Sequence, residues 1–277
     1  MKILYFDCFA GISGDMTLGA LVDLGVDSEY LIDELNKLAI SDEFEIKVYR
    51  ADKMGITGTK VDVILKNNDE NNHHDHHDHH HHDDNYNHSH HHDHNHHTHS
   101  HDHHHRNLTD IKEIIDSSDL SQRVKDLSHK IFMEIAVAEA KVHNKSIKEV
   151  HFHEVGAVDS IVDIVGVAIC LDKLEVDKII SSTVELGRGF VKCAHGVIPV
   201  PAPATIEILK DVPIHLNGVN GEATTPTGAA ILKVNVDSYE DEINFSIEKV
   251  GYGVGTKDFH IPNLLRVYLG KKKIIKK

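Results

Sequence analysis

The chain has 277 residues, 40% of them hydrophobic, which is enough to bury a sizeable core in one large domain or two small ones. Its formal net charge is −15 with histidine neutral, and no cluster of Lys and Arg is present, which argues against a nucleic-acid partner. No apolar run approaches the ~20 residues of a membrane span, and the N-terminal run reaches Asp7 too early for a signal peptide. Three scattered cysteines (Cys8, Cys170 and Cys193) do not form a disulfide framework, so we expect a cytoplasmic protein without a membrane partner.

The first 66 residues predict a strand, a loop, a helix and then two more strands. Residues 2–9 have the character of a strand, Gly-Ile-Ser-Gly is a turn, and 15–25 has apolar residues at helical spacing. Residues 43–66 predict two strands, FEIKVYRAD and TKVDVIL, joined by the glycine-containing segment KMGITG.

Residues 67–106 consist almost entirely of His, Asp and Asn, with no apolar periodicity, which predicts a disordered insert. The insert holds 20 of the 27 histidines, interleaved with aspartates. Imidazole and carboxylate both bind first-row metals, so we predict a reservoir for nickel, copper, zinc or cobalt, suited to storage or delivery. A purification tag and an expanded neutral repeat are the alternatives. The predicted metal ligands of this insert include His73, His76, His79, His90, His94 and His103.

After the insert, the pattern alternates between helices and strands. Helices are predicted at about 108–117, 121–143 and 157–174, with short ones after Pro203 and Pro226; strands are predicted at 177–186 and 243–252. This alternation indicates a mixed α/β fold, with a mixed sheet and flanking helices. We expect a single domain built from 1–66 and 107–277 with the insert as a surface loop; two domains joined by the insert is the alternative.

The segment VHFHEVGAVDSIVD, residues 150–163, combines imidazoles and carboxylates. If HFH is extended, its two histidines project from the same face, a glutamate follows at the turn, and two aspartates share one face of the next helix. The second aspartate interrupts an apolar run, where a carboxylate needs a partner or a metal ion. Because the residue four after the second histidine is alanine, the zinc-protease pattern HExxH does not fit. A structural helix with polar caps is the alternative. The predicted metal ligands are His151, His153, Glu154 and Asp163.

Two further segments have the character of loops that hold an anion, and a third, 251–266, supplies a flexible turn and two cations, Lys257 and Arg266, for which plain solvated charge is the alternative. FAGISGDM (9–16) connects a strand to a helix, but it lacks the lysine of a phosphate-binding loop, and a plain turn explains it equally well. A phosphate here would need a divalent cation between Asp7 and Asp15. GEATTPTG (221–228) has an N-cap and a helix-starting proline, and capping is its alternative. The predicted ligand contacts are Gly11, Ser13, Gly14, Thr224, Thr225, Thr227, Lys257 and Arg266.

Six segments, in order along nearly the whole chain, resemble the nickel insertion protein (LarC) family. They are FDCFAGISGDM, the His-rich insert, VHFHEVGAVDSIVDIVG, AHGVIPVPAPAT, GEATTPTGAAIL, and GYGVGTKD with PNLLRV. The resemblance implies a nickel chelatase of the lyase class, which uses CTP to insert Ni²⁺ into pyridinium-3,5-bisthiocarboxylic acid mononucleotide. Two sulfurs and a ring carbon become nickel ligands, which completes the nickel-pincer cofactor of lactate racemase.

The resemblance also implies roles for individual residues. His151, His153 and Glu154 are expected to transfer nickel, with Asp159 or Asp163 as an orienting or additional ligand. His195 is the expected base for the ring proton, and it acts together with Glu154 and Asp159. Family members commonly continue past PNLLRV into a region that binds CTP with Mg²⁺ or Mn²⁺, whereas this sequence stops at KKKIIKK. We therefore expect a region outside this sequence or a C-terminal partner chain to bind CTP, and we expect a homo-oligomer.

Rival interpretations remain open at this point. A nickel storage protein or metallochaperone without turnover would also carry the insert. A metal-dependent phosphohydrolase would need a second aspartate where the sequence has Phe9, and a nickel GTPase would need the missing phosphate-loop lysine.

Overall fold

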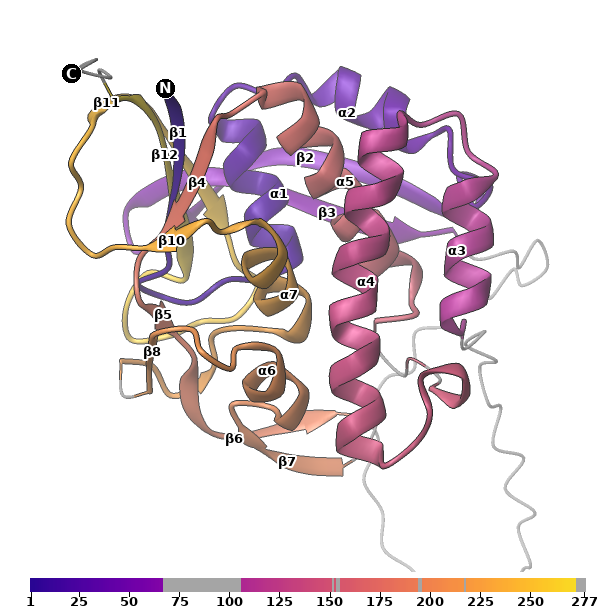
Figure 1. Ribbon diagram of the computed structural model, residues 1–277. Coiled ribbons are helices and arrows are strands. Elements are labelled where there is room, and N and C mark those ends of the chain that lie inside the picture. Colours follow the sequence, from indigo (N-terminus) through magenta and orange to yellow (C-terminus); the bar gives the residue numbers. More distant parts are fainter. Residues whose placement is uncertain (67–105, 151, 153–154, 194–195, 217, 273–277) are drawn as a thin grey trace, which may run out of the picture.

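The computed structural model describes residues 1–277 except 67–105, 151, 153–154, 194–195, 217 and 273–277 (Figure 1). Its centre is a seven-stranded mixed sheet in the order β10-β4-β1-β12-β11-β3-β2. Strand β1 is antiparallel to β12 and parallel to β4, and β2 is antiparallel to β3. The bounds are β1 Lys2–Asp7, β2 Phe44–Lys53, β3 Ile56–Leu65, β4 Lys178–Ser181, β10 Ser238–Tyr239, β11 Ser246–Val254 and β12 Leu264–Lys271.

Helices cover the sheet over an extended apolar core (Figure 1). Side chains alternate along β1: Leu4 and Phe6 enter this core, whereas Ile3 and Tyr5 join a smaller apolar cluster on the opposite face. Both faces of β1 are therefore buried. The helices are α1 Gly14–Asp23, α2 Ser28–Leu35, α3 Leu108–Asp116, α4 Gln122–His143, α5 Val158–Leu174, α6 Pro203–Ile208 and α7 Pro226–Asn235, with a 3₁₀ turn η1 at Ile147–Glu149.

Local sequence explains where these helices begin and end. Ser121 accepts a hydrogen bond from the backbone N–H of Val124 at the start of α4, and Asn144 ends that helix in the left-handed conformation. Thr225 caps α7 through the N–H of Gly228 and is followed by a proline at the first helical position. Among the helices that the structure describes, none has the length and apolar character needed to cross a membrane.

Two small sheets lie beyond the end of the main sheet (Figure 1). One pairs β5 with β8 in parallel, and the other has the order β7-β6-β9. Their bounds are β5 Val184–Glu185, β6 Gly187–Cys193, β7 Gly196–Val200, β8 Ile214–His215 and β9 Gly221–Glu222.

The predicted fold class, a mixed sheet with flanking helices, is confirmed. The main sheet takes β1, β2 and β3 from before residue 67 and four strands from after residue 105. The single strand predicted at 177–186 is wrong in one respect, because the chain leaves the sheet after Ser181. There the Thr183 N–H donates to the carboxylate of Asp241, and β5 then starts a separate sheet.

Candidate functional site

Three helix N-termini meet at one cleft of about 1230 Å³. Its walls come from the starts of α1, α5 and α7, from β3, and from the loop that precedes β12. The first turn of a helix leaves backbone N–H groups without intrahelical partners, so this arrangement points several donors toward the same region. The polar lining residues include Ser13, Asp15, Lys60, Asp62, Asp159, Asp163, Glu222, Thr225, Thr227, Thr256, Lys257 and Asn263.

The cleft is open because β3 separates from β11. Strand β3 pairs with β2 along its full length, but its described contact with β11 is a single parallel bridge between Thr59 and Gly253. Residues 60–65 therefore line the cleft on the side that faces away from β2.

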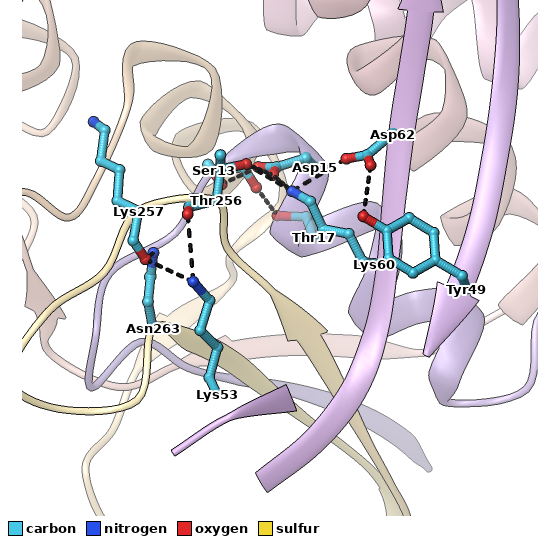
Figure 2. Close-up of polar contacts among 10 residues, drawn as sticks. All are labelled: Ser13, Asp15, Thr17, Tyr49, Lys53, Lys60, Asp62, Thr256, Lys257 and Asn263. Carbon is cyan, nitrogen blue, oxygen red and sulfur yellow. Dashed lines mark hydrogen bonds and ion pairs between the residues drawn. The ribbon is translucent and has the colours of Figure 1, made fainter. Parts of the chain in front are cut away.

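A buried lysine occupies the base of this opening (Figure 2). Lys60 is 6% exposed, and its ammonium donates to the Asp15 carboxylate and to Thr256 Oγ1 at 2.8 Å. Asp62 Oδ1 lies 3.6 Å from the same nitrogen. Ser13 donates to the second oxygen of Asp15, so that carboxylate is held from both sides. The lysine thus fixes the start of α1 against β3 and the loop at Thr256.

Asp163 on α5 is a carboxyl group at this cleft with one oxygen that lacks a hydrogen-bond donor among the described residues. Part of the residue reaches the surface, but its Oδ1 is buried and accepts no hydrogen bond from the described part of the chain. Burial raises the pKa of Asp163 well above its ordinary value, and the charges of Asp15 and Asp159 raise it further. Lys60 and the Asp15 N–H oppose this shift. The group therefore retains its proton to higher pH than a solvated aspartate.

Gly14 permits this arrangement because it has no side chain. A Cβ at this position would lie 2.5 Å from Asp163 Oδ2. The start of α1 can therefore approach α5 only with glycine here.

The opposite rim is a loop held by lysines (Figure 2). Lys257 pairs with the Glu222 carboxylate at 2.6 Å, and its side chain is 44% exposed. Lys53 donates to the carbonyls of Thr256 and Lys257 at 3.3 and 3.2 Å, and Asn263 donates to the Lys257 carbonyl at 2.8 Å. Lys257 is therefore held in place and partly open to solvent.

The predicted ligand contacts fall into three groups. The fold brings Ser13, Gly14, Thr225, Thr227 and Lys257 to the cleft, together with Asp159 and Asp163. Two others support its wall from behind: Gly11, at φ +87°, packs against the Ala223 backbone, and the buried Thr224 hydroxyl donates to the Glu185 carbonyl at 2.7 Å.

Arg266 lies elsewhere. It faces Asp7 across the β1–β12 pair and donates to that carboxylate from Nε at 2.9 Å and Nη2 at 2.5 Å. Asp7 and Asp15 are each paired with a different cation, Arg266 and Lys60. The expected divalent cation between these two aspartates thus has no support in the described contacts.

Several predicted residues lie outside the described residues. They are His151, His153, Glu154, His195 and the insert histidines, including His73, His76, His79, His90, His94 and His103. The described neighbours Phe152, Val155 and Gly156 line the cleft. Within the described ranges, no group of three or more His, Cys, Asp or Glu side chains is placed to hold a metal ion.

Sequence reasoning missed Lys60, Thr256 and Asn263 as members of the site. Lys60 alternates with valine in a half-polar strand, which is the pattern of a solvent-facing lysine. Only the separation of β3 from β11 turns that position into the base of a cleft.

The fold and the cleft together define an α/β protein with a polar cleft at the starts of three helices. Comparison with known proteins gives the family. The family model described as nickel insertion protein matches residues 4–277, so the chain belongs to the nickel insertion protein family.

Three relatives share the name pyridinium-3,5-bisthiocarboxylic acid mononucleotide nickel insertion protein. The chain is 61% identical to the one from Clostridium acetobutylicum and 57% identical to the one from Clostridium kluyveri, over 272 residues in each case. It is 48% identical to the one from Geobacillus kaustophilus over 273 residues. Each match covers 98% of this chain but only 64%, 63% and 60% of the respective relative. No solved structure matches the chain.

Proposed function

We propose that this chain acts in the insertion of Ni²⁺ into pyridinium-3,5-bisthiocarboxylic acid mononucleotide, as a chelatase of the lyase class. The cleft carries this proposal, because segments far apart in the sequence converge on it: 13–16, 155–160, 225–227 and 256–257. Family membership and the names of the relatives support the same reaction.

The mononucleotide phosphate fits the rim formed by the start of α7 and Lys257. The start of a helix favours an anion; here Pro226 has no N–H and the Gly228 N–H donates to Thr225 Oγ1, so the Thr227 N–H and the two threonine hydroxyls are the groups offered to the phosphate. Lys257 would exchange its contact with Glu222 for the phosphate, which its partly exposed ammonium permits. Ser13 and Gly14 would form the opposite wall of the same ligand site.

Nickel is a substrate here, and the segment around residues 150–163 is its proposed entry point. His151, His153 and Glu154 would hold the ion, with Asp159 and Asp163 as orienting or additional ligands. Nitrogen and oxygen donors bind nickel without the softness of thiocarboxylate sulfur, so the ion can pass from the protein to the substrate. The position of Phe152 and Val155 in the cleft lining supports this assignment.

Formation of the carbon–nickel bond requires a base. The ring C–H bond breaks, its electron pair forms the bond to nickel, and the proton goes to the base, for which we propose His195. Glu154 and Asp159 would orient the reacting groups.

CTP with Mg²⁺ or Mn²⁺ is proposed to bind outside this chain. The relatives are longer than the matched region, and the described residues offer no cluster of metal ligands for a nucleotide-bound cation. We also propose that the chain acts with a C-terminal partner region, forms a homo-oligomer and resides in the cytoplasm. The free, buried thiols of Cys8 and Cys170 are compatible with a reducing compartment.

The test is His151→Ala together with His153→Ala, with the insert intact. In the presence of CTP and a C-terminal region from a relative, we expect nickel incorporation into the mononucleotide to fall at least about 100-fold, because two proposed ligands are lost. The control is His129→Ala with His143→Ala, which removes two histidines from α4. Undiminished incorporation in the first variant would refute the ligand assignment. Nickel binding by the native chain without any incorporation would favour a storage protein.

A further inference from the structure

A buried side-chain amide at the cleft has an oxygen without a hydrogen-bond donor among the described residues. Asn263 directly precedes β12, lines the cleft and is only 4% exposed (Figure 2). Its Nδ2 donates to the Lys257 carbonyl at 2.8 Å, whereas its Oδ1 is buried and accepts no hydrogen bond from the described part of the chain. The side chain therefore keeps one acceptor that the described residues do not use.

The surroundings of Asn263 fix which end of the amide is the free acceptor. A carbonyl oxygen can bond only to the NH₂ end, so the Lys257 carbonyl holds Nδ2 and leaves Oδ1 on the other side. The backbone of Asn263 is fixed as well, because its carbonyl accepts from the Gly255 N–H at 3.0 Å. A Cβ at Gly255 would lie 2.8 Å from Oδ1, so this glycine packs closely against the amide. The amide is thus held in one orientation.

The chemistry of an amide oxygen restricts what can bind to it. Of the buried side-chain atoms that lack a partner within the described ranges, two border the cleft: Asp163 Oδ1 and Asn263 Oδ1. A carboxyl group can carry a proton and can then donate as well as accept, but an amide oxygen can only accept. Asn263 Oδ1 is therefore matched only by a ligand group that has a hydrogen to donate.

Few groups of a pyridinium mononucleotide can donate a hydrogen bond. At neutral pH its phosphate and thiocarboxylates are ionised and act as acceptors, and its ring nitrogen is bonded to the sugar and carries no hydrogen. The sugar hydroxyls are its remaining strong donors. They are covalently close to the phosphate, and Lys257, the proposed phosphate contact, is the residue to which Asn263 is bonded. The free acceptor thus lies beside the expected place of the sugar.

We propose that Asn263 is a specificity-determining residue, whose Oδ1 accepts a hydrogen bond from a sugar hydroxyl of the mononucleotide. This inference rests on the proposed function and extends it from the phosphate to the sugar. Oδ1 is buried while Lys257 is paired with Glu222. In this proposal, Lys257 uncovers Oδ1 when it exchanges Glu222 for the phosphate.

The native chain tests the proposal without any change to the protein. Titration calorimetry, with nickel and CTP omitted, compares the mononucleotide with its 2′-deoxy and 3′-deoxy forms. We expect one of the deoxy forms to bind about tenfold more weakly or worse, because it leaves the buried oxygen without its donor. Equal affinity for all three ligands would overturn the proposal and would indicate that Oδ1 bonds only to a buried water.

Asn263→Ala tests whether this residue is the acceptor. We expect the variant to bind the mononucleotide about tenfold more weakly than the native chain does, and no better than it binds the discriminated deoxy form. A purely structural defect would weaken the binding of all three ligands in the same proportion. A preserved gap between the mononucleotide and that deoxy form would therefore remove Asn263 from sugar recognition.

Asn235→Ala is the matched control, because it removes the same kind of bond from a residue that does not line the cleft. Asn235 Nδ2 donates to the Ile231 carbonyl at 2.8 Å, the same length as the bond made by Asn263. We expect native affinities for all three ligands. Failure of this inference is distinguishable from failure of the proposed function: equal binding of the three ligands refutes sugar recognition alone, whereas no binding of any of them refutes the ligand site in the cleft and the sugar contact with it.

Discussion

Two buried carboxyl groups in this protein have opposite surroundings. Glu185, 3% exposed, accepts hydrogen bonds from the Gly187 N–H at 2.8 Å and the Gly218 N–H at 3.1 Å, and His215 Nδ1 lies 2.5 Å from it. Asp163 has one buried oxygen that accepts nothing from the described residues. Glu185 joins segments of the small sheets, whereas Asp163 borders the cleft.

These surroundings indicate a structural role for Glu185 and a chemical role for Asp163. A carboxylate whose lone pairs are satisfied by backbone donors fixes those backbones, and it has no capacity left for a ligand. A carboxyl group with a buried oxygen that accepts no hydrogen bond costs stability, and that oxygen keeps the capacity to accept one from a ligand. The comparison predicts opposite effects of removing the two groups.

The largest effect is expected for Glu185→Ala. Two backbone N–H groups and an imidazole lose their acceptor, and each unsatisfied buried donor costs roughly 1–3 kcal/mol. We expect the free energy of unfolding to fall by roughly 3 kcal/mol, measured by urea denaturation. A loss below about 1 kcal/mol would mean that water replaces the carboxylate, and the structural role would be refuted.

The substitution Asp163→Asn should raise the free energy of unfolding, whereas Glu185→Ala lowers it. The raised pKa means that the folded state binds the proton more tightly than the unfolded chain, so native stability falls as pH rises from about 4 through the folded pKa. Asparagine does not ionise and avoids this loss. We expect the variant to be more stable than the native chain by roughly 1–3 kcal/mol at pH 8, with a smaller gap at pH 5. Parallel urea titrations at both pH values measure this gap, and a gap that is independent of pH would contradict the assignment.

The smallest effect is expected for His215→Ala. Its side chain is 61% exposed, and Glu185 keeps both backbone donors when the imidazole is removed. We expect a loss of about 0.5–1 kcal/mol in thermal or urea unfolding. A loss as large as that of Glu185→Ala would show that the imidazole, rather than the backbone, is the main partner of this carboxylate.

The local sequence pattern was enough to predict most of the helices and the β2–β3 hairpin, because apolar periodicity and capping residues are encoded within each segment. The local pattern did not predict strand β12, and within that segment only Arg266 was singled out, as a ligand contact. The register that pairs β1 with β12 joins residues more than 250 positions apart and sets Asp7 opposite Arg266. That cross-strand ion pair explains why a residue expected to contact a ligand lies on the sheet instead.

The cleft was partly predictable for a related reason. Polar residues at the starts of helices are conspicuous in a sequence, and Ser13, Asp159, Thr225 and Thr227 come from such positions, whereas Asp163 stands out because it interrupts the apolar run of α5. Lys60 and Asn263 are ordinary polar residues until long-range packing brings them together, and no local signal identifies them.

Glu43 joins the two segments that flank residues 67–105: the Lys66 N–H donates to its carbonyl at 2.9 Å, and Arg106 donates from Nη2 to both of its carboxylate oxygens. Because Lys66 and Arg106 are bonded to the same residue, the connection between them can be short or long without altering the packed elements on either side. Loop-closure entropy grows only with the logarithm of length, so doubling the 39 residues between them would cost about 0.6 kcal/mol. The length of this connection is therefore only weakly constrained by the stability of the described part of the chain.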